Sequence, residues 1–220
     1  MKKLKELKYF FWAALFAVSM GFFEAAVVVD LRKIFNIGGS LFPLNLDVEM
    51  CGVIEMWREF FSIVMLVSVA AILSRGKKTG VAWFCYLFGI WDILYYVFLK
   101  ILIGWPESLM TWDILFLLPV PWVSPVLAPI IASLTLISIA VVTIHIYESD
   151  KKINHPRILF TAELFAALIM IISFCWQWRD IAAGGVPKNF PWIIFAVSEF
   201  LMLGIFLLFT IPTFRESKND

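Results

Sequence analysis

Five carboxylates inside otherwise apolar stretches of the sequence are expected in the same half of a membrane: Glu24, Glu55, Glu59, Asp92 and Glu199. An ionisable side chain inside a lipid bilayer costs free energy, so it is kept only where a partner, a ligand or a water-filled space stabilises it. The nearby cations are Arg58 and Lys100, so the carboxylates are in excess. Excess carboxylates must be protonated, bound to a cation or exposed to water. This surplus is the strongest functional signal in the sequence.

The spacing of these residues predicts two polar helix faces. Residues three or four apart lie on the same side of a helix, so one face carries Glu55, Arg58 and Glu59, and another carries Asp92, Tyr96 and Lys100. Such faces should turn away from lipid and toward each other. The resulting candidates for a ligand- or ion-binding site are Glu24, Glu55, Arg58, Glu59, Asp92, Tyr96, Lys100 and Glu199. The alternative is that the same charges form structural ion pairs that hold helices together.

The residue types favour a hard divalent cation over other cofactors. Carboxylates suit Mg²⁺, Ca²⁺ or Mn²⁺, and Glu24, Glu55 and Glu59 would be the ligands of a metal if one binds. The two histidines, His145 and His155, are expected at the opposite side of the membrane. Haem held by two facing histidines is therefore not expected, and no motif identifies a catalytic residue.

The two cysteines Cys51 and Cys175 are expected at helix ends on one side of the membrane. A disulfide between them would form only in an oxidising compartment. The sequence leaves their pairing open.

The composition indicates that these side chains belong to an integral membrane protein. The chain has 220 residues, 62% of them hydrophobic and 16% charged, with a mean hydropathy of +0.90, whereas soluble proteins carry about 45–50% apolar and about 25% charged residues. Six stretches are long enough to cross the bilayer as helices. They are approximately Tyr9–Val29, Cys51–Leu73, Val81–Ile103, Pro125–Tyr147, Ile158–Cys175 and Pro191–Ile211. The connections between them are short, so residues 1–220 are predicted to form a single all-α, polytopic transmembrane domain.

Lysine and arginine predict the orientation of the helices. They gather at the amino terminus, around 75–78, around 151–157 and at the carboxyl terminus, and loops rich in these residues stay in the cytoplasm. Both termini are therefore predicted to be cytoplasmic, and the carboxylates to lie in the outer half of the bilayer. The compact loops favour a prokaryotic plasma (inner) membrane.

Residues 106–118 are predicted to form a short helix that does not cross the membrane. Such a helix would be about 20 Å long, so it would lie in the outer interface or re-enter it. Trp105, Trp112, Asp113 and Trp122 are the candidates for a lid over the site.

Three classes of function remain. The first is transport or binding of a small solute, an ion or protons through the carboxylate-rich cavity. The second is a membrane enzyme that acts on a lipid or quinone at the outer leaflet, with Glu55 or Glu59 as acid–base group. The third is a structural or assembly subunit of a membrane complex. The formal net charge of +1 does not suit nucleic-acid binding, so the expected partners are membrane lipids and either a second copy or another subunit.

Overall fold

Six long helices form most of the molecule. The computed structural model describes residues 2–34, 41–42, 49–74, 79–149, 151 and 153–216. For residues 2–6, 49–51 and 215–216 it describes the backbone only. The helices are α1 (Lys2–Ile34), α2 (Glu49–Ser74), α3 (Gly80–Ile103), α4 (Leu127–Glu148), α5 (Pro156–Phe174) and α7 (Trp192–Glu216). In this described part, each is long and apolar enough to cross a membrane. The prediction of six such helices is confirmed.

Local sequence sets several of the helix ends. Helix α3 ends where Gly104 takes a left-handed backbone conformation, with a φ of 72°, and its N–H donates to the carbonyl of Lys100. Glycine adopts this conformation without the steric cost of a side chain. Helix α5 begins at Pro156, which suits the first helical turn because proline lacks an N–H and its φ is already helical.

The predicted helix over residues 106–118 is wrong, because this segment contains the first strand of a β-hairpin. Strand β1 (Trp112–Phe116) pairs antiparallel with β2 (Trp122–Pro125). The connection holds Pro119 and Pro121, which cannot donate hydrogen bonds to a helix. The strands themselves are rich in β-branched and aromatic residues, which favour extended backbone. A second element that was not expected is the one-turn helix α6 (Trp178–Ala182).

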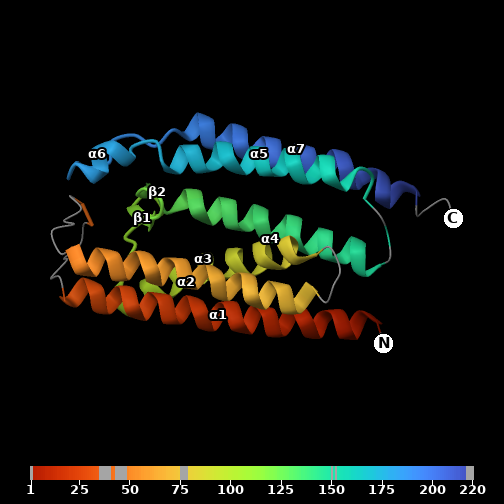
Figure 1. The fold of residues 1–220 in the computed structure, drawn as a ribbon, viewed down its shortest axis with the longest axis horizontal. Coiled ribbons are helices and arrows are strands. Elements are labelled where there is room, and N and C mark those ends of the chain that lie inside the picture. The colour runs from red at the N-terminus through yellow and green to blue at the C-terminus, as the bar shows by residue number, and fades with distance from the viewer. Residues whose placement is uncertain are drawn as a thin grey trace.

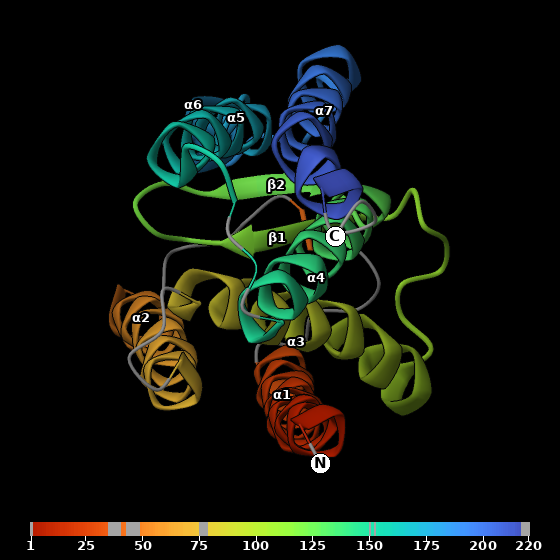
Figure 2. The same ribbon diagram turned by 90° about the vertical axis from the view of Figure 1, so that its right-hand side faces the viewer.

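The helices are arranged in two groups, one on each side of α4. Figures 1 and 2 show α1, α2 and α3 on one side of α4, and α5 and α7 on the other. The start of α1 and the end of α7 lie at the same end of the bundle, and the β-hairpin lies at the opposite end (Figure 1). An even number of crossings requires this arrangement. Which end faces the cytoplasm stays a prediction.

Small residues let the central helices approach each other closely. Ala13 and Ala17 of α1 are buried against α3 in one hydrophobic cluster. A Cβ added to Gly89 of α3 would lie 2.7 Å from the backbone oxygen of Ser133 in α4. Such contacts between small residues are typical of helix packing in membranes, where van der Waals contact contributes much of the attraction.

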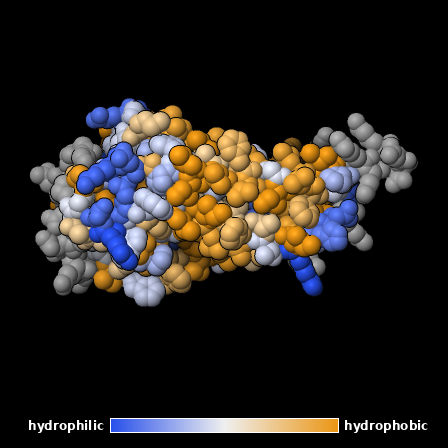
Figure 3. All heavy atoms as spheres, turned by 90° about the horizontal axis from the view of Figure 1, so that it is seen from above, coloured by the Kyte–Doolittle hydropathy of each residue, from blue (hydrophilic) through white to orange (hydrophobic). Residues whose placement is uncertain are grey.

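The surface has the polarity of a protein embedded in lipid. Figure 3 shows a largely hydrophobic middle, with hydrophilic residues toward both ends of the visible face. Large side chains such as Ile193, Phe200 and Leu208 of α7 are strongly exposed. A soluble monomer rarely exposes apolar patches of this extent, so the surface agrees with the six apolar helices.

Candidate ligand-binding site

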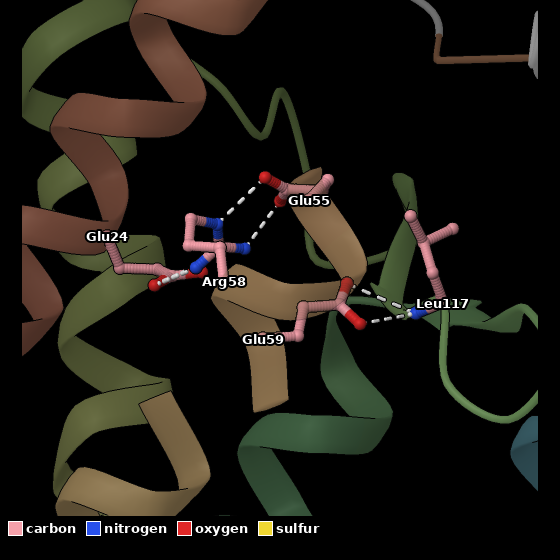
Figure 4. Close-up of polar contacts among 5 residues, drawn as sticks. All are labelled: Glu24, Glu55, Arg58, Glu59 and Leu117. Atoms are coloured by element: carbon pink, nitrogen blue, oxygen red, sulfur yellow. Dashed lines mark hydrogen bonds and ion pairs between the residues drawn. The ribbon is translucent and has the colours of Figure 1, made fainter. Parts of the chain in front are cut away.

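Arg58 binds two glutamates on two different helices. Its Nε donates to Glu55 Oε2 at 2.8 Å, and its Nη2 donates to Glu55 Oε1, so the pair within α2 is bidentate. Its Nη1 forms an ion pair with Glu24 of α1. Figure 4 shows the guanidinium between the two carboxylates. Arg58 and Glu55 share one face of α2, as their spacing predicted, and they form the kind of structural ion pair that the sequence left open as the alternative to a binding site. Glu24 extends this ion pair from helix α1.

Glu59 faces a backbone group and not a cation. Both of its carboxylate oxygens accept the N–H of Leu117, at 3.1 and 2.9 Å (Figure 4). Leu117 directly follows strand β1, so Glu59 attaches α2 to the β-hairpin. A single N–H leaves most of the acceptor capacity of a carboxylate unused.

Asp92 and Tyr96 connect α3 to its two neighbours. The hydroxyl of Ser133 in α4 donates to Asp92 Oδ2 at 2.8 Å. The hydroxyl of Tyr96 donates to Asp113 Oδ2 of strand β1 at 2.9 Å. Because Asp92 and Tyr96 are four residues apart, the carboxylate and the phenol lie on the same face of α3.

These side chains surround one cavity of about 60 Å³. This exceeds the roughly 10–15 Å³ that a cavity needs to hold a water molecule, so the cavity is large enough to be hydrated. Its described lining residues are Glu24, Val28, Glu55, Arg58, Glu59, Trp91, Asp92, Tyr95, Tyr96, Asp113, Ile114, Leu115 and Phe116. Five of them are carboxylates, and Arg58 is the one cation among them. The cavity can therefore attract protons or a small cation.

Burial controls the ionisation of Asp113, which lies outside the membrane-spanning helices. Its side chain is 1% exposed, and desolvation raises its pKa from 3.8 to about 6. The hydrogen bond from Tyr96 and the charge of Arg32 oppose this rise but do not cancel it. Asp113 therefore exchanges its proton closer to neutral pH than an ordinary aspartate does.

We expect the replacement of Asp113 by asparagine to remove a pH-dependent part of the stability. The raised pKa means that folded protein keeps a proton that unfolded protein has lost, so wild-type stability falls as the pH rises from about 4 to above about 6. Relative to the Asp113→Asn variant, the free energy of unfolding of the wild type should fall by about 3 kcal/mol over this pH range. At higher pH the difference between the two proteins should stay constant. Unfolding by sodium dodecyl sulfate in mixed micelles, measured at a series of pH values, gives this difference. A constant difference over the whole range would contradict the assignment.

Two predicted members of the site lie elsewhere in the structure. Lys100 donates to the carbonyls of Gly104 at 3.0 Å and Pro106 at 2.8 Å, beyond the end of α3, and it does not line the cavity. Glu199 of α7 accepts the hydroxyl of Thr135 in α4 at 2.7 Å, also away from the cavity. Helix α7 packs against α5 and α4, so it holds Glu199 apart from the carboxylates of α1, α2 and α3.

The four predicted lid residues do not lie together at the cavity. Asp113 lines the cavity, but the three tryptophans pack against other side chains. Trp105 lies under the guanidinium of Arg32, at 4.1 Å from its ring centroid. Trp112 contacts Phe190, and Trp122 stacks on Phe174 with an interplanar angle of 12°. None of these tryptophans lines the cavity.

The prediction missed the aromatic wall of the cavity, formed by Trp91, Tyr95 and Phe116 together with the predicted Tyr96. Trp91 and Tyr95 precede Asp92 and Tyr96 by one residue and repeat their spacing of four. This second stripe beside the first was the signal that could have identified them. Phe116 could not be found in this way, because it reaches the cavity through the unexpected strand β1.

The geometry does not support a metal at Glu24, Glu55 and Glu59. Within the described residues, no group of three or more His, Cys, Asp or Glu side chains is placed to hold a metal ion. Glu24 and Glu55 already bind Arg58, and Glu59 binds Leu117. Cys175 has a free thiol. The side chain of Cys51, the partner that the sequence left open for it, lies outside the described ones.

By length and composition, the six apolar helices define a multi-pass membrane protein. Its distinguishing feature is a small cavity with more carboxylates than cations. In comparisons with known proteins, no family model, no curated protein and no solved structure matches this chain.

Proposed function

We propose that the protein is a membrane transport protein whose carboxylate-rich cavity binds a small cation or exchangeable protons. The observation that carries the proposal is the imbalance of charge in the cavity, where five carboxylates face one guanidinium. In a medium of low dielectric constant, such an imbalance is stable only if protons or a cation compensate it. Binding and release of such a compensating proton or cation are the elementary steps of transport.

Asp92 is the carboxylate best placed to take up the transported charge. Its partner is the neutral hydroxyl of Ser133, whereas Glu24 and Glu55 bind Arg58. It is half-buried and lines the cavity. The bonds at Glu24, Glu55 and Glu59 hold α1, α2 and the hairpin together, and Asp92 is left with unused acceptor sites.

Replacement of Asp92 by asparagine is expected to abolish charge movement through the protein. Purified protein is reconstituted and adsorbed on a solid-supported membrane, and currents are recorded after concentration jumps of protons, Na⁺, K⁺ or ammonium. Wild-type protein should give a transient current with at least one of these ions. The Asp92→Asn variant should give no more than protein-free membranes, because asparagine keeps the shape of the side chain but does not take up charge.

Glu163→Gln is the matched control. Glu163 is a half-buried carboxylate of α5, and it does not line the cavity. This variant should keep the wild-type current. No current from wild-type protein with any of the four ions would overturn the proposed transport function, as would an unchanged current in Asp92→Asn.

A structural role in a membrane complex is the second candidate, and the bridge from Glu24 through Arg58 to Glu55 favours it. This bridge joins α1 to α2 in the way that interhelical ion pairs do. A structural subunit would tolerate Asp92→Asn, would carry no current and would co-purify with a partner in a fixed ratio. The same recordings therefore discriminate between the two functions.

A further inference from the structure

Aromatic rings line the cavity together with its carboxylates. Trp91, Tyr95, Tyr96 and Phe116 all line it. The face of an aromatic ring attracts a cation held close to it, and an organic ammonium gains from this contact because it sheds water more readily than a small metal ion does. The described carboxylates are not placed to hold a metal. The walls therefore suit an ammonium group better than an inorganic cation.

The spare acceptor sites have the number and type that an ammonium group needs. A protonated primary amine has three N–H donors. Asp92 accepts one hydroxyl hydrogen bond, and Glu59 accepts one backbone N–H. Each of these carboxylates can accept further hydrogen bonds, so together they can bind the donors of one amine.

Trp91 provides an independent indication of a ligand. Its side chain is 6% exposed and lines the cavity, yet its indole N–H has no acceptor within the described part of the chain. A buried donor without a partner costs about 1–3 kcal/mol. A cation alone does not satisfy this donor. A water molecule in the cavity satisfies it, and so does a ligand that also carries an oxygen acceptor and takes the place of that water.

We infer that the cavity binds a small protonated amine that also carries an oxygen acceptor, a compound of the amino-alcohol class. The ammonium group binds the carboxylates against the aromatic wall, and the oxygen accepts the N–H of Trp91. The cavity of about 60 Å³ limits the ligand to a few non-hydrogen atoms. This inference rests on the proposed function, because it names the cation that the proposed transporter takes.

Three small molecules test separately whether the cavity recognises the ammonium group and the oxygen acceptor. Ethanolamine has both groups, ethylamine lacks the oxygen, and ethylene glycol lacks the charge. Their binding to purified protein is measured by saturation-transfer NMR titration, at constant ionic strength and at a pH where both amines are protonated. We expect ethanolamine to bind about tenfold more tightly than ethylamine, because only ethanolamine can accept a hydrogen bond from the Trp91 N–H. Ethylene glycol should show no saturable binding.

Two tryptophan variants test the role of the indole N–H. In Trp91→Phe, the preference for ethanolamine over ethylamine should fall to about twofold or less, because phenylalanine has no donor. Trp122→Phe is the matched control: the Trp122 N–H is also buried without a described acceptor, but it does not line the cavity. This variant should keep the tenfold preference.

Glycerophosphoethanolamine distinguishes a free amine from a lipid headgroup. It carries the same amine on a bulkier phosphodiester, and we expect it to bind more weakly than ethanolamine because the cavity is small. Equal or tighter binding, lost in Asp92→Asn, would support the same chemistry with a headgroup as its source.

Three results would overturn the inference: equal binding of ethanolamine and ethylamine to wild-type protein, a preference that survives in Trp91→Phe, or ethylene glycol binding as tightly as ethanolamine. If any of these occurred while cation jumps still gave Asp92-dependent currents, the amino-alcohol class would be wrong and the transport proposal would stand. The absence of all such currents would instead count against the transport proposal itself.

Discussion

Replacement of Arg58 by leucine is expected to lower the free energy of unfolding by about 3 kcal/mol, because it leaves two mostly buried carboxylates without their cation. Arg58 and Glu24 have side chains that are 18% and 11% exposed, so water screens this pair only weakly. Leucine also supplies none of the donors that bind Glu24 and Glu55. The loss can be measured by unfolding in mixed micelles of dodecyl sulfate, followed by circular dichroism.

Two further variants separate the ion pair from the loss of packing. Arg179→Leu removes an exposed arginine that lies over the ring of Trp178, and it should cost less than about 1 kcal/mol. The double variant Glu24→Gln with Arg58→Leu removes one uncompensated charge and should recover part of the stability. If Arg58→Leu cost no more than Arg179→Leu, the assignment of Arg58 as the link between α1 and α2 would be wrong.

The sequence was sufficient to predict the six helices, because the length of an apolar stretch is decided by the thickness of the bilayer. It was also sufficient for the face that carries Glu55, Arg58 and Glu59, since this follows from helical spacing alone. The ion pair of Arg58 with Glu24 depends on which face of α1 meets α2. That choice comes from packing contacts between helices, which the spacing within one helix does not determine.

The hairpin explains most of what the sequence did not predict about the site. Asp113, Phe116 and Leu117 reach the cavity or its carboxylates only because residues 112–125 fold into two strands. An apolar segment flanked by tryptophans suits an interfacial helix as well as a strand, and a proline directly after residue 118 is compatible with a helix that ends there. The position of Glu199 along its helix predicts the same depth in the membrane as that of the other carboxylates. Its distance from them depends on lateral position, which depth does not specify.

The second large effect is expected at Gly89, where α3 and α4 are in close contact. An alanine Cβ at this position would lie 2.7 Å from the backbone oxygen of Ser133 and 2.7 Å from Ile137 Cγ1. Because a backbone oxygen cannot rotate away as a side chain can, the two helices must separate. Overpacking of this kind costs about 1–3 kcal/mol, so Gly89→Ala should be clearly destabilised in the same micelle assay.

The displacement at Gly89 should also reach the cavity. Ser133, whose carbonyl would be displaced, is the residue whose hydroxyl donates to Asp92 at 2.8 Å. Gly89→Ala should therefore weaken the Asp92-dependent response to cation jumps as well as the stability. Gly204→Ala is the matched control, because a Cβ there has no atom within 4 Å and alanine is the better helix former by about 1 kcal/mol. Its stability should be unchanged or slightly raised. Equal effects of the two variants would mean that α3 and α4 are farther apart than the contact at Gly89 requires, and that Ser133 does not set the position of Asp92.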